Sequence, residues 1–356
     1  MINVKVFIDY DLAATAHLTA GLCELEKRGL VSVSWRLPFR AYPKHAAPVV
    51  VRMEVTKSDG QVVRHAFDFH DVNDCWDIPA LSWCHVYWKC TYNSAAIALL
   101  PETERNKVHR YGLHFLARSR HDRLVYLRWI GSARARLSYR YRKNGKIGPF
   151  HLYSEMFARL RGYYLRLFVD EYESAAAYRP IGVYFHPGCW PTDAEAKTNL
   201  LRREIIQRLR HRFSDRFVGG FVNDAHARSR FPQDVYPHAT NHKEYVRNLQ
   251  NSHVVISTNG TSGCHSLRTG EALAAGAILV TETPVNEIDA QLVHGKNVFF
   301  YNTPAECESI CQSILDSSGD TLATLHGETK AYYDEYLKPD ASLLKRLQFS
   351  NILPCE

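Results

Sequence analysis

The chain lacks the features that mark membrane-spanning, secreted and disulfide-rich proteins. It has no run of about 18 apolar residues, so no transmembrane helix is expected. Its N-terminal stretch carries Lys5, Asp9 and Asp11 among apolar residues, which argues against a secretory signal. The 9 cysteines include no CxxC pair, and reduced thiols in a cytosolic protein are therefore expected.

Two kinds of binding pattern are also missing. No GxGxxG follows the first expected strand, so the dinucleotide-binding fingerprint is absent. No RNP, KH or zinc pattern supports nucleic-acid recognition, and no nucleic-acid partner is expected. Cys307 and Cys311 lie one helical turn apart beside Ile310 and Ile314, a spacing that predicts core residues rather than metal ligands.

The order of the expected elements predicts an α/β protein with two domains in 356 residues. The first half opens with a strand at residues 4–8, a helix that ends at Gly29 and a strand at 31–35. From residue 181 onward strands and helices alternate, which predicts a doubly wound, Rossmann-like domain. Its strands are expected at 181–185, 217–222, 254–256, 277–281 and 298–301, its helices at 200–213, 243–250, 267–275, 285–293 and from 303, and a final helical segment from near Glu328 to Leu347.

Residues 254–288 read as strand, glycine loop, helix and strand, which is a right-handed βαβ unit. Such a unit places the loop and the helix N-terminus at the carboxyl edge of the sheet, where unpaired N–H groups favour an anion. The loop contains Gly260, Thr261, Ser262 and Gly263, followed by Arg268 in the helix. Glu271 lies one turn further on and is suited to accept hydrogen bonds from ribose or sugar hydroxyls.

A polar stretch follows the hairpin that Asp59-Gly60 predicts between strands 49–55 and 62–69. It places His70, Asp71 and Asp74 directly after a strand, where α/β proteins often carry catalytic groups. The alternative is an ordinary polar turn with an aspartate that caps the next helix. In the aromatic strand at 83–92, Lys89 is expected to pack structurally and to extend its amine to solvent.

The net charge of +7 is concentrated in the segment 118–166, which we call the basic aromatic segment. The segment contains many arginines and lysines but only two acidic residues, Asp122 and Glu155. Tyrosines are interleaved with its basic residues. This composition suits an anionic surface such as lipid headgroups, a polyphosphate or a nucleic acid. A solvated helical face is the alternative.

The run from Arg268 to Gly276, together with Glu287 and the turn His294-Gly295-Lys296-Asn297, resembles the donor-domain signature of GT-B glycosyltransferases. It is similar to that of the group 1 enzymes and to the R-x-x-E-A-x-x-x-G run of exostosin-like enzymes. The likeness covers roughly residues 181–320. It implies two Rossmann-like domains that face a cleft, with a C-terminal helix that packs back on the first domain.

The resemblance implies a domain plan. Residues 1–178 form an acceptor-side domain that includes the basic aromatic segment, 179–325 a nucleotide-sugar donor domain, and 326–356 a helical crossover. Residues 175–179 are the expected linker.

The resemblance also implies roles for residues of the donor half. Glu271 matches the glutamate that contacts the ribose, and the loop around Gly263 and Cys264 matches the diphosphate loop. Arg268 matches the basic residue of the motif, and Arg203 is a further basic candidate. The nucleotide-sugar is the donor substrate, and no cofactor or metal is expected.

One position departs from the family pattern. Retaining group 1 enzymes carry an acidic residue eight positions before the conserved glutamate, and here that position is Gly263. The departure favours an inverting reaction, which needs a general base at the acceptor hydroxyl. Asp71 and Asp74 are the first candidates for the base, Asp9 and Asp11 follow, and His186 is the alternative from the donor half.

Three functions remain open at this point. The first is transfer of a sugar to a glycan or glycolipid acceptor in polysaccharide biosynthesis, by a cytoplasmic enzyme that binds an anionic membrane surface peripherally. The second is a sugar-nucleotide epimerase of the same fold, which leaves the basic aromatic segment unexplained. The third is a non-enzymatic protein that binds RNA or membranes. This function leaves the glycine loop and Glu271 without a role.

Overall fold

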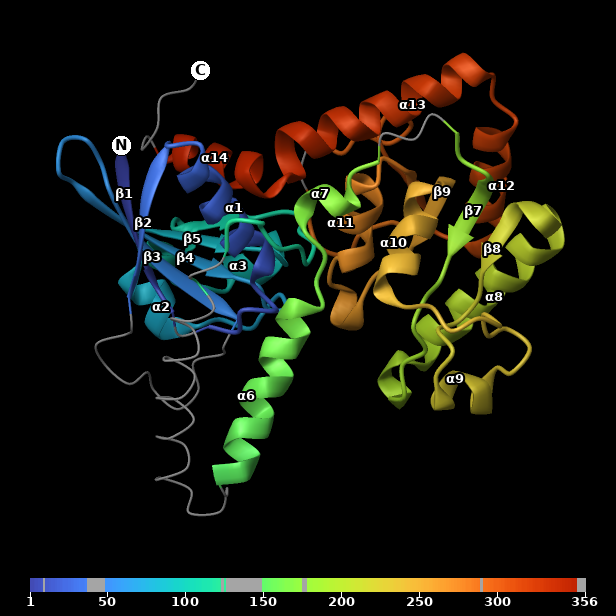
Figure 1. The fold of residues 1–356 in the computed structure, drawn as a ribbon, viewed down its shortest axis with the longest axis horizontal. Coiled ribbons are helices and arrows are strands. Elements are labelled where there is room, and N and C mark those ends of the chain that lie inside the picture. Colours follow the sequence, from blue (N-terminus) through green and yellow to red (C-terminus); the bar gives the residue numbers. More distant parts are fainter. Residues whose placement is uncertain are drawn as a thin grey trace. The chain divides into compact units, whose positions relative to one another are not determined.

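The structure is a computed structural model that describes residues 1–8, 10–36, 49–122, 125, 149–174, 178–288 and 291–350. The chain forms two compact units, Met1–Val169 with Lys338–Glu356 and Asp170–Leu337 (Figure 1). Residues 123–124 and 126–148 of the basic aromatic segment, and Asp9, lie outside the described residues. None of the described helices has both the length and the hydropathy needed to cross a bilayer.

The first unit is built on a six-stranded mixed sheet in the order β2-β1-β3-β4-β5-β6. The strands are β1 (Ile2–Phe7), β2 (Val31–Arg36), β3 (Val50–Thr56), β4 (Val62–Asp68), β5 (Val86–Lys89) and β6 (Val108–Arg110). Only β3 runs antiparallel to the others, and the predicted β3–β4 hairpin is confirmed, with Gly60 at φ +83° in its turn. The other five strands therefore end at one carboxyl edge.

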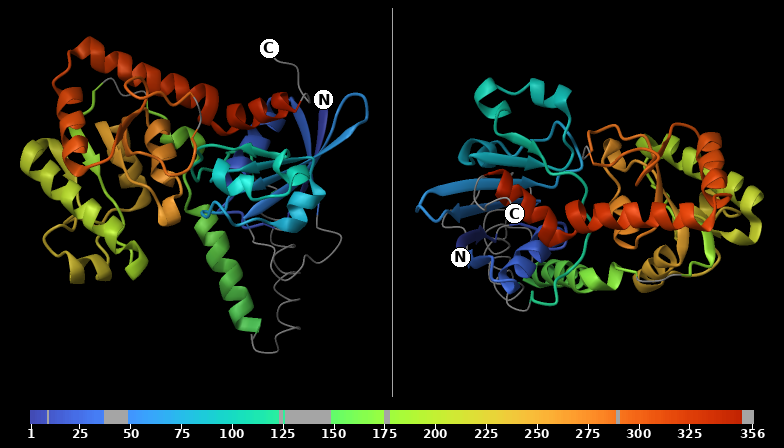
Figure 2. Two further views of the ribbon diagram at one scale, coloured as in Figure 1. Left: turned by 180° about the vertical axis from the view of Figure 1, so that it is seen from behind. Right: turned by 90° about the horizontal axis from the view of Figure 1, so that it is seen from above.

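The first unit also contains helices. They are α1 (Ala16–Lys27), α2 (Ile78–Trp83), α3 (Ser94–Ala98), α4 (Glu102–Arg105), α6 (Pro149–Tyr164) and α14 (Pro339–Phe349). Figure 2 shows α14, at the red end of the colour bar, beside the blue α1. A Cβ on Gly21 would lie 2.4 Å from the Pro339 carbonyl oxygen, so glycine permits this close packing. The prediction that the C-terminal helix packs back on the first domain is confirmed.

The second unit has a five-stranded, all-parallel sheet in the order β11-β10-β9-β7-β8. The strands are β7 (Ile181–Phe185), β8 (Phe217–Gly219), β9 (Ser252–Ser257), β10 (Ile278–Glu282) and β11 (Phe299–Tyr301). The helices are α7 (Val169–Tyr172), α8 (Ala196–Phe213), α9 (Ala225–Arg230), α10 (His242–Gln250), α11 (Leu267–Ala274), α12 (Pro304–Leu315) and α13 (Gly319–Tyr332). Two Rossmann-like units are the predicted fold class, and Cys307 and Cys311 lie in the second core as expected.

The residues just before β7 belong firmly to the second unit. The Tyr172 hydroxyl lies 2.8 Å from His242 Nε2, and Gln250 donates to the carbonyl of Glu171 at 3.0 Å. Arg179 is buried and donates to the carbonyls of Gln250, Ser252 and Ala275. Burial lowers the pKa of Arg179 to about 10. These contacts explain why the unit begins at residue 170.

One predicted helix is wrong. The described part of residues 285–293 is not helical, because side chains there bond to loop backbone: Asn286 donates to the Gly263 carbonyl at 2.8 Å, and Asn297 accepts from the Val293 N–H at 2.9 Å. The segment from Glu328 to Leu347 is helical, as predicted. It is divided by a π turn at Tyr333–Leu337, and Pro339 starts a new helix because proline cannot continue the old one.

Candidate functional site

The parallel sheet of the second unit has a topological switch point between β7 and β9. The chain moves outward from β7 to β8 on one side and from β9 to β10 on the other. The loops that follow β7 and β9 therefore diverge, and in open α/β sheets ligands bind in the crevice that this divergence creates. His186 starts the first loop, and residues 258–266 form the second.

The loop after β9 is held in one shape by its own backbone and by the next loop. Gly260 donates to the Cys264 carbonyl at 2.8 Å, and Gly263 donates to the Gly260 carbonyl at 3.1 Å. Ser262 and Gly263 have φ values of 55° and +73°. The amides of Gly260 and Gly263 thus shape the loop here, while the role of residues 260–263 in donor binding stays a prediction.

Gly263 occupies a position that disfavours any side chain. Its positive φ suits glycine, and an added Cβ would lie 3.0 Å from the Val285 Cβ. Its carbonyl also accepts the 2.8 Å hydrogen bond from buried Asn286. A side chain at this position, such as the acidic residue of the family pattern, is therefore disfavoured in this loop conformation.

Arg268 lies in the first turn of α11, directly behind the loop. The Ser266 side chain caps the helix by accepting from the Arg268 N–H at 3.3 Å. The Arg268 guanidinium lies 5.9 Å from the centre of the Tyr245 ring. A cation in the first turn is not stabilised by the helix dipole, and binding of an anion at this helix N-terminus by Arg268 stays a prediction.

His186, at the end of β7, is buried near this cation. Its Nδ1 lies 3.0 Å from the Gly220 carbonyl oxygen, which can only accept, so Nδ1 carries the proton and Nε2 keeps its lone pair. Burial, and then the charge of Arg268, lower the pKa of His186 to about 4. The imidazole is therefore neutral at physiological pH.

Glu271 is buried and is not a surface carboxylate. It is 6% exposed and accepts a 3.0 Å hydrogen bond from the Tyr245 hydroxyl. Burial, followed by the charge of Glu271, raises the pKa of Tyr245 well above its usual value, so this tyrosine stays a donor. The orientation of Glu271 is thereby set by a partner that no sequence motif indicated.

Arg202, rather than its neighbour Arg203, reaches the switch point. It is 5% exposed and donates to Thr258 Oγ1 at 2.9 Å, to the Gly188 carbonyl at 2.9 Å and to the Asn259 carbonyl at 3.3 Å. It thus joins the two diverging loops. Burial, then the charge of Arg268, lower the pKa of Arg202 to about 10, so the guanidinium stays charged. The sequence prediction missed it, although Arg202 lies one turn from Ile205 and Ile206 on the buried face of α8.

Arg203 points elsewhere. Its guanidinium pairs with Asp234 at 3.0 Å and lies 5.4 Å from the centre of the Phe231 ring. Its positive charge is already matched by a carboxylate in this structure. Donor binding by Arg203 stays a prediction.

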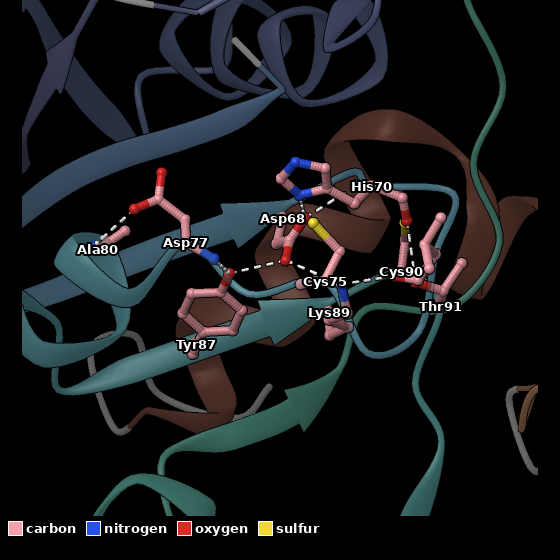
Figure 3. Close-up of polar contacts among 10 residues, drawn as sticks. Asp68, His70, Cys75, Asp77, Ala80, Tyr87, Lys89, Cys90 and Thr91 are labelled. Atoms are coloured by element: carbon pink, nitrogen blue, oxygen red, sulfur yellow. Dashed lines mark hydrogen bonds and ion pairs between the residues drawn. The ribbon is translucent and has the colours of Figure 1, made fainter. Parts of the chain in front are cut away.

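The polar stretch of the first unit has a different organisation from the one expected. Asp71 and Asp74 are exposed on the loop after β4, and Asp77 is the aspartate that caps α2, accepting from the Ala80 N–H at 3.0 Å. The prediction that Lys89 extends its amine to solvent is wrong. Its Nζ is fully buried and donates to Asp68 at 2.9 Å and to the Cys75 carbonyl at 2.8 Å (Figure 3).

Asp68 is the centre of this buried network. One carboxylate oxygen accepts from Lys89 and from the Tyr87 hydroxyl at 2.7 Å, and the other accepts from His70 Nδ1 at 2.6 Å (Figure 3). Burial alone would raise the pKa of Asp68, but the hydrogen bond from His70 and the charge of Lys89 hold it below its usual value. Asp68 and Lys89 were not predicted as site residues, because they belong to two different strands.

Comparison with known proteins bears on the second unit. Residues 198–328 match the family described as glycosyl transferase-like. That segment contains the loop 258–266, Arg202, Arg268 and Glu271, and the match confirms the resemblance to glycosyltransferases. A search of curated proteins finds no match.

Several solved structures are similar to the whole chain at low identity. HepE of Anabaena in complex with UDP-glucose is 11% identical, with 93% of this chain and 88% of that chain covered and a TM-score of 0.37. A glycosyltransferase from Rickettsia africae is 12% identical, with 96% and 82% covered and a TM-score of 0.40. TarM is 10% identical, with 87% and 72% covered and a TM-score of 0.37.

Proposed function

We propose that the protein transfers a sugar from a nucleotide-sugar donor to a glycan or glycolipid acceptor. The observation that carries the proposal is Arg268, which stands in the first turn of α11 at the switch point, behind a rigid glycine loop. A diphosphate at this place would meet a fixed cation and the positive end of a helix. Glu271 would accept the ribose hydroxyls, held in place by Tyr245.

The same groups would assist departure of the nucleoside diphosphate. Negative charge grows on the leaving phosphate as the sugar–oxygen bond breaks, and donors fixed in advance stabilise it. Arg268 would supply the charge, while Arg202 keeps the two loops in register. With these cations in place, the proposed reaction needs no bound metal and no cofactor.

Inversion at the sugar is the stereochemistry that we propose. It is supported by Gly263, which stands where the retaining enzymes have an acidic residue and where the positive φ and the nearby Val285 disfavour a side chain. Asp71, Asp74 and His186 stay the sequence-based candidates for the general base. Of these, His186 has a lone pair on Nε2, and the two aspartates are exposed.

The acceptor and the place of action belong to the proposal as well. The basic aromatic segment is rich in arginine and tyrosine, a composition that favours anionic lipid headgroups. We infer peripheral binding at the cytoplasmic face of a membrane, where a glycolipid acceptor would be presented, in polysaccharide biosynthesis.

Nucleotide binding tests the proposed function directly. In thermal-shift assays with UDP, GDP, ADP and TDP, at least one nucleotide should raise the Tm of the full chain. Arg268→Gln should weaken the binding of that nucleotide by about 10-fold or more, because the charge-assisted contact to its phosphate is lost. Arg212→Gln is the matched control, because Arg212 lies at the end of α8 and bonds to Gln312. If none of the nucleotides stabilises the wild type, the proposal is wrong.

A further inference from the structure

The carboxyl edge of the first unit's sheet contains a second arrangement of chemically competent groups. His70 follows β4 by two residues, and the parallel strands β1, β4, β5 and β6 all end at this edge. In α/β domains this edge is where ligands bind. The aspartates predicted as bases lie on the same loop, but a histidine and a buried carboxylate are the groups that are joined to each other here.

The hydrogen bond between His70 and Asp68 determines which ring nitrogen carries the proton. Asp68 is a carboxylate with its pKa held low, so it can only accept, and the 2.6 Å contact requires a proton on His70 Nδ1. The His70 backbone N–H donates to the same oxygen at 2.8 Å, which fixes the residue from two sides. In the neutral ring Nε2 is then left with a lone pair and no proton.

His65, on β4 itself, shows that this tautomer is not imposed on every histidine here. His65 Nδ1 accepts from the Trp88 indole N–H at 3.2 Å, so its proton lies on Nε2. Burial lowers the pKa of His65 to about 3. A histidine on β4 and another just after it thus hold opposite tautomers, each set by its hydrogen-bond partner.

The Nε2 of His70 has no hydrogen-bond partner within the described residues, although it is covered from solvent. The side chain as a whole is 13% exposed, so one part of the ring reaches the surface. A covered lone pair without a donor costs about 1–3 kcal/mol. A bound hydroxyl would supply the missing donor.

We propose that His70 is the general base that removes the proton from the acceptor hydroxyl, and that Asp68 positions it; this rests on the proposed glycosyl transfer. The hydroxyl O–H bond breaks as the proton moves to Nε2. The oxygen forms a bond to the anomeric carbon, and the nucleoside diphosphate leaves with the electron pair of the broken bond. Asp68 stabilises the resulting imidazolium, which then releases its proton to water.

The surrounding charges fit this role. Among the described residues, Asp68 from β4 and Asp77 before α2 interact electrostatically with His70, and the Cys90 Sγ contacts its carbonyl. Lys89 and Tyr87 from β5 bond to Asp68 on its other side. The charge of Lys89 neutralises Asp68 in the resting state, and it is anchored by the carbonyls of Val72 and Cys75. The network therefore also holds the loop on which an acceptor would rest.

His70→Asn separates base chemistry from architecture. The asparagine amide can still donate to Asp68 from the position of Nδ1, but it has no counterpart of Nε2. Release of nucleoside diphosphate from a panel of nucleotide-sugars, with water as acceptor, should fall in kcat by about 100-fold or more. The Tm shift with the nucleoside diphosphate should match that of the wild type, because the donor groups lie in the second unit.

His85→Asn is the matched control. His85 is exposed and directly precedes β5, so it lies at the opposite, amino-terminal edge of the same sheet. This variant should turn over donor at the wild-type rate. His70→Ala should be rescued by added imidazole, which a purely structural role would not allow. Selective ¹⁵N-histidine NMR should show an Nδ1-protonated ring that disappears in His70→Asn and changes tautomer in Asp68→Asn.

The outcomes are distinct. Wild-type turnover by His70→Asn, or loss of turnover in Asp71→Asn or Asp74→Asn with His70→Asn active, would overturn the inference and leave the proposed transfer intact. A wild type that neither binds nucleoside diphosphates nor hydrolyses any nucleotide-sugar would overturn both. If His70→Asn does not fold, the test is whether imidazole restores turnover in His70→Ala. Failure of imidazole to restore turnover would contradict the role of His70 as general base.

Discussion

The hydroxyl of Tyr245 donates a 3.0 Å hydrogen bond to the buried carboxylate of Glu271. Tyr245 comes from α10 and Glu271 from α11, so the pair joins two helices behind the glycine loop. The orientation of this carboxylate is therefore set in part by Tyr245. Its contribution to stability and its proposed role in ribose binding can be separated by substitution.

Glu271→Gln should keep the bond from Tyr245 but lose the charge. We expect unfolding free energy within about 1 kcal/mol of the wild type and nucleoside diphosphate binding weakened by about 10-fold, as a charge-assisted bond becomes a neutral one. Glu271→Ala should also lose about 1–3 kcal/mol of stability, because the Tyr245 hydroxyl is left buried without its acceptor. Calorimetric titration and urea unfolding measure the two effects. Glu308→Gln, on α12, is the control, and equal binding by Glu271→Ala and wild type would disprove the ribose-binding role.

Gly263→Ala should cost more stability than Gly295→Ala. Both glycines have positive φ, +73° and +80°. Each variant should therefore lose about 1 kcal/mol of stability, because alanine is strained in this backbone conformation. Only Gly263 meets Val285, at 3.0 Å, while nothing lies within 4 Å of the added Cβ on Gly295. We expect about 1–2 kcal/mol of additional loss for Gly263→Ala and weaker nucleotide binding. Equal losses in urea unfolding would show that Val285 moves aside freely.

Stability should fall as the pH drops from about 6.5 towards 4, before most carboxylates titrate. The pKa values of His186 and His326 are lowered by burial to about 4. In this pH range the two histidines therefore bind protons in the unfolded chain but not in the folded chain. Each such histidine contributes up to about 1.4 kcal/mol per pH unit to the slope of the unfolding free energy against pH. Below this range, Asp68 adds a loss of the same sign, because its folded pKa lies below its usual value.

His326→Asn isolates one contribution to this pH dependence. The asparagine amide can replace His326 Nδ1 as the donor to the Gly276 carbonyl, a contact of 2.8 Å, but it does not titrate. Urea unfolding at a series of pH values should show a shallower slope for the variant between pH 6.5 and 4. An unchanged slope would mean that His326 protonates equally well in both states.

The basic aromatic segment should bind vesicles that contain anionic phosphatidylserine but not vesicles of phosphatidylcholine alone. Its arginines attract anionic headgroups, and the attraction should weaken as the salt concentration rises from 0.05 to about 0.5 M. Sedimentation with liposomes measures the bound fraction. Arg134→Gln with Arg136→Gln should reduce binding, and Arg210→Gln with Arg212→Gln is the charge-matched control. Binding that is indifferent to lipid charge and salt would remove the membrane from the proposal.

Regular elements were largely predictable because their signals are local. The boundaries of β7 were predicted residue for residue, and the strand–loop–helix–strand order of 254–281 was correct. Hydrophobic periodicity and a terminal glycine act over one or two turns of chain. The helix expected at 285–293 failed because the Asn286 amide bonds to the carbonyl of Gly263, which is distant in sequence.

The candidate site was only partly predictable for a related reason. Sequence alone determined a glycine loop, an arginine and a glutamate at the end of a buried strand, because motif spacing and βα chirality require that placement. Only the tertiary structure decided that Arg202 and not Arg203 holds the loops, since neighbours on a helix point about 100° apart. It alone decided that Asp68, to which His70 is bonded, is a buried carboxylate paired with Lys89, because that pair depends on the register of β4 against β5.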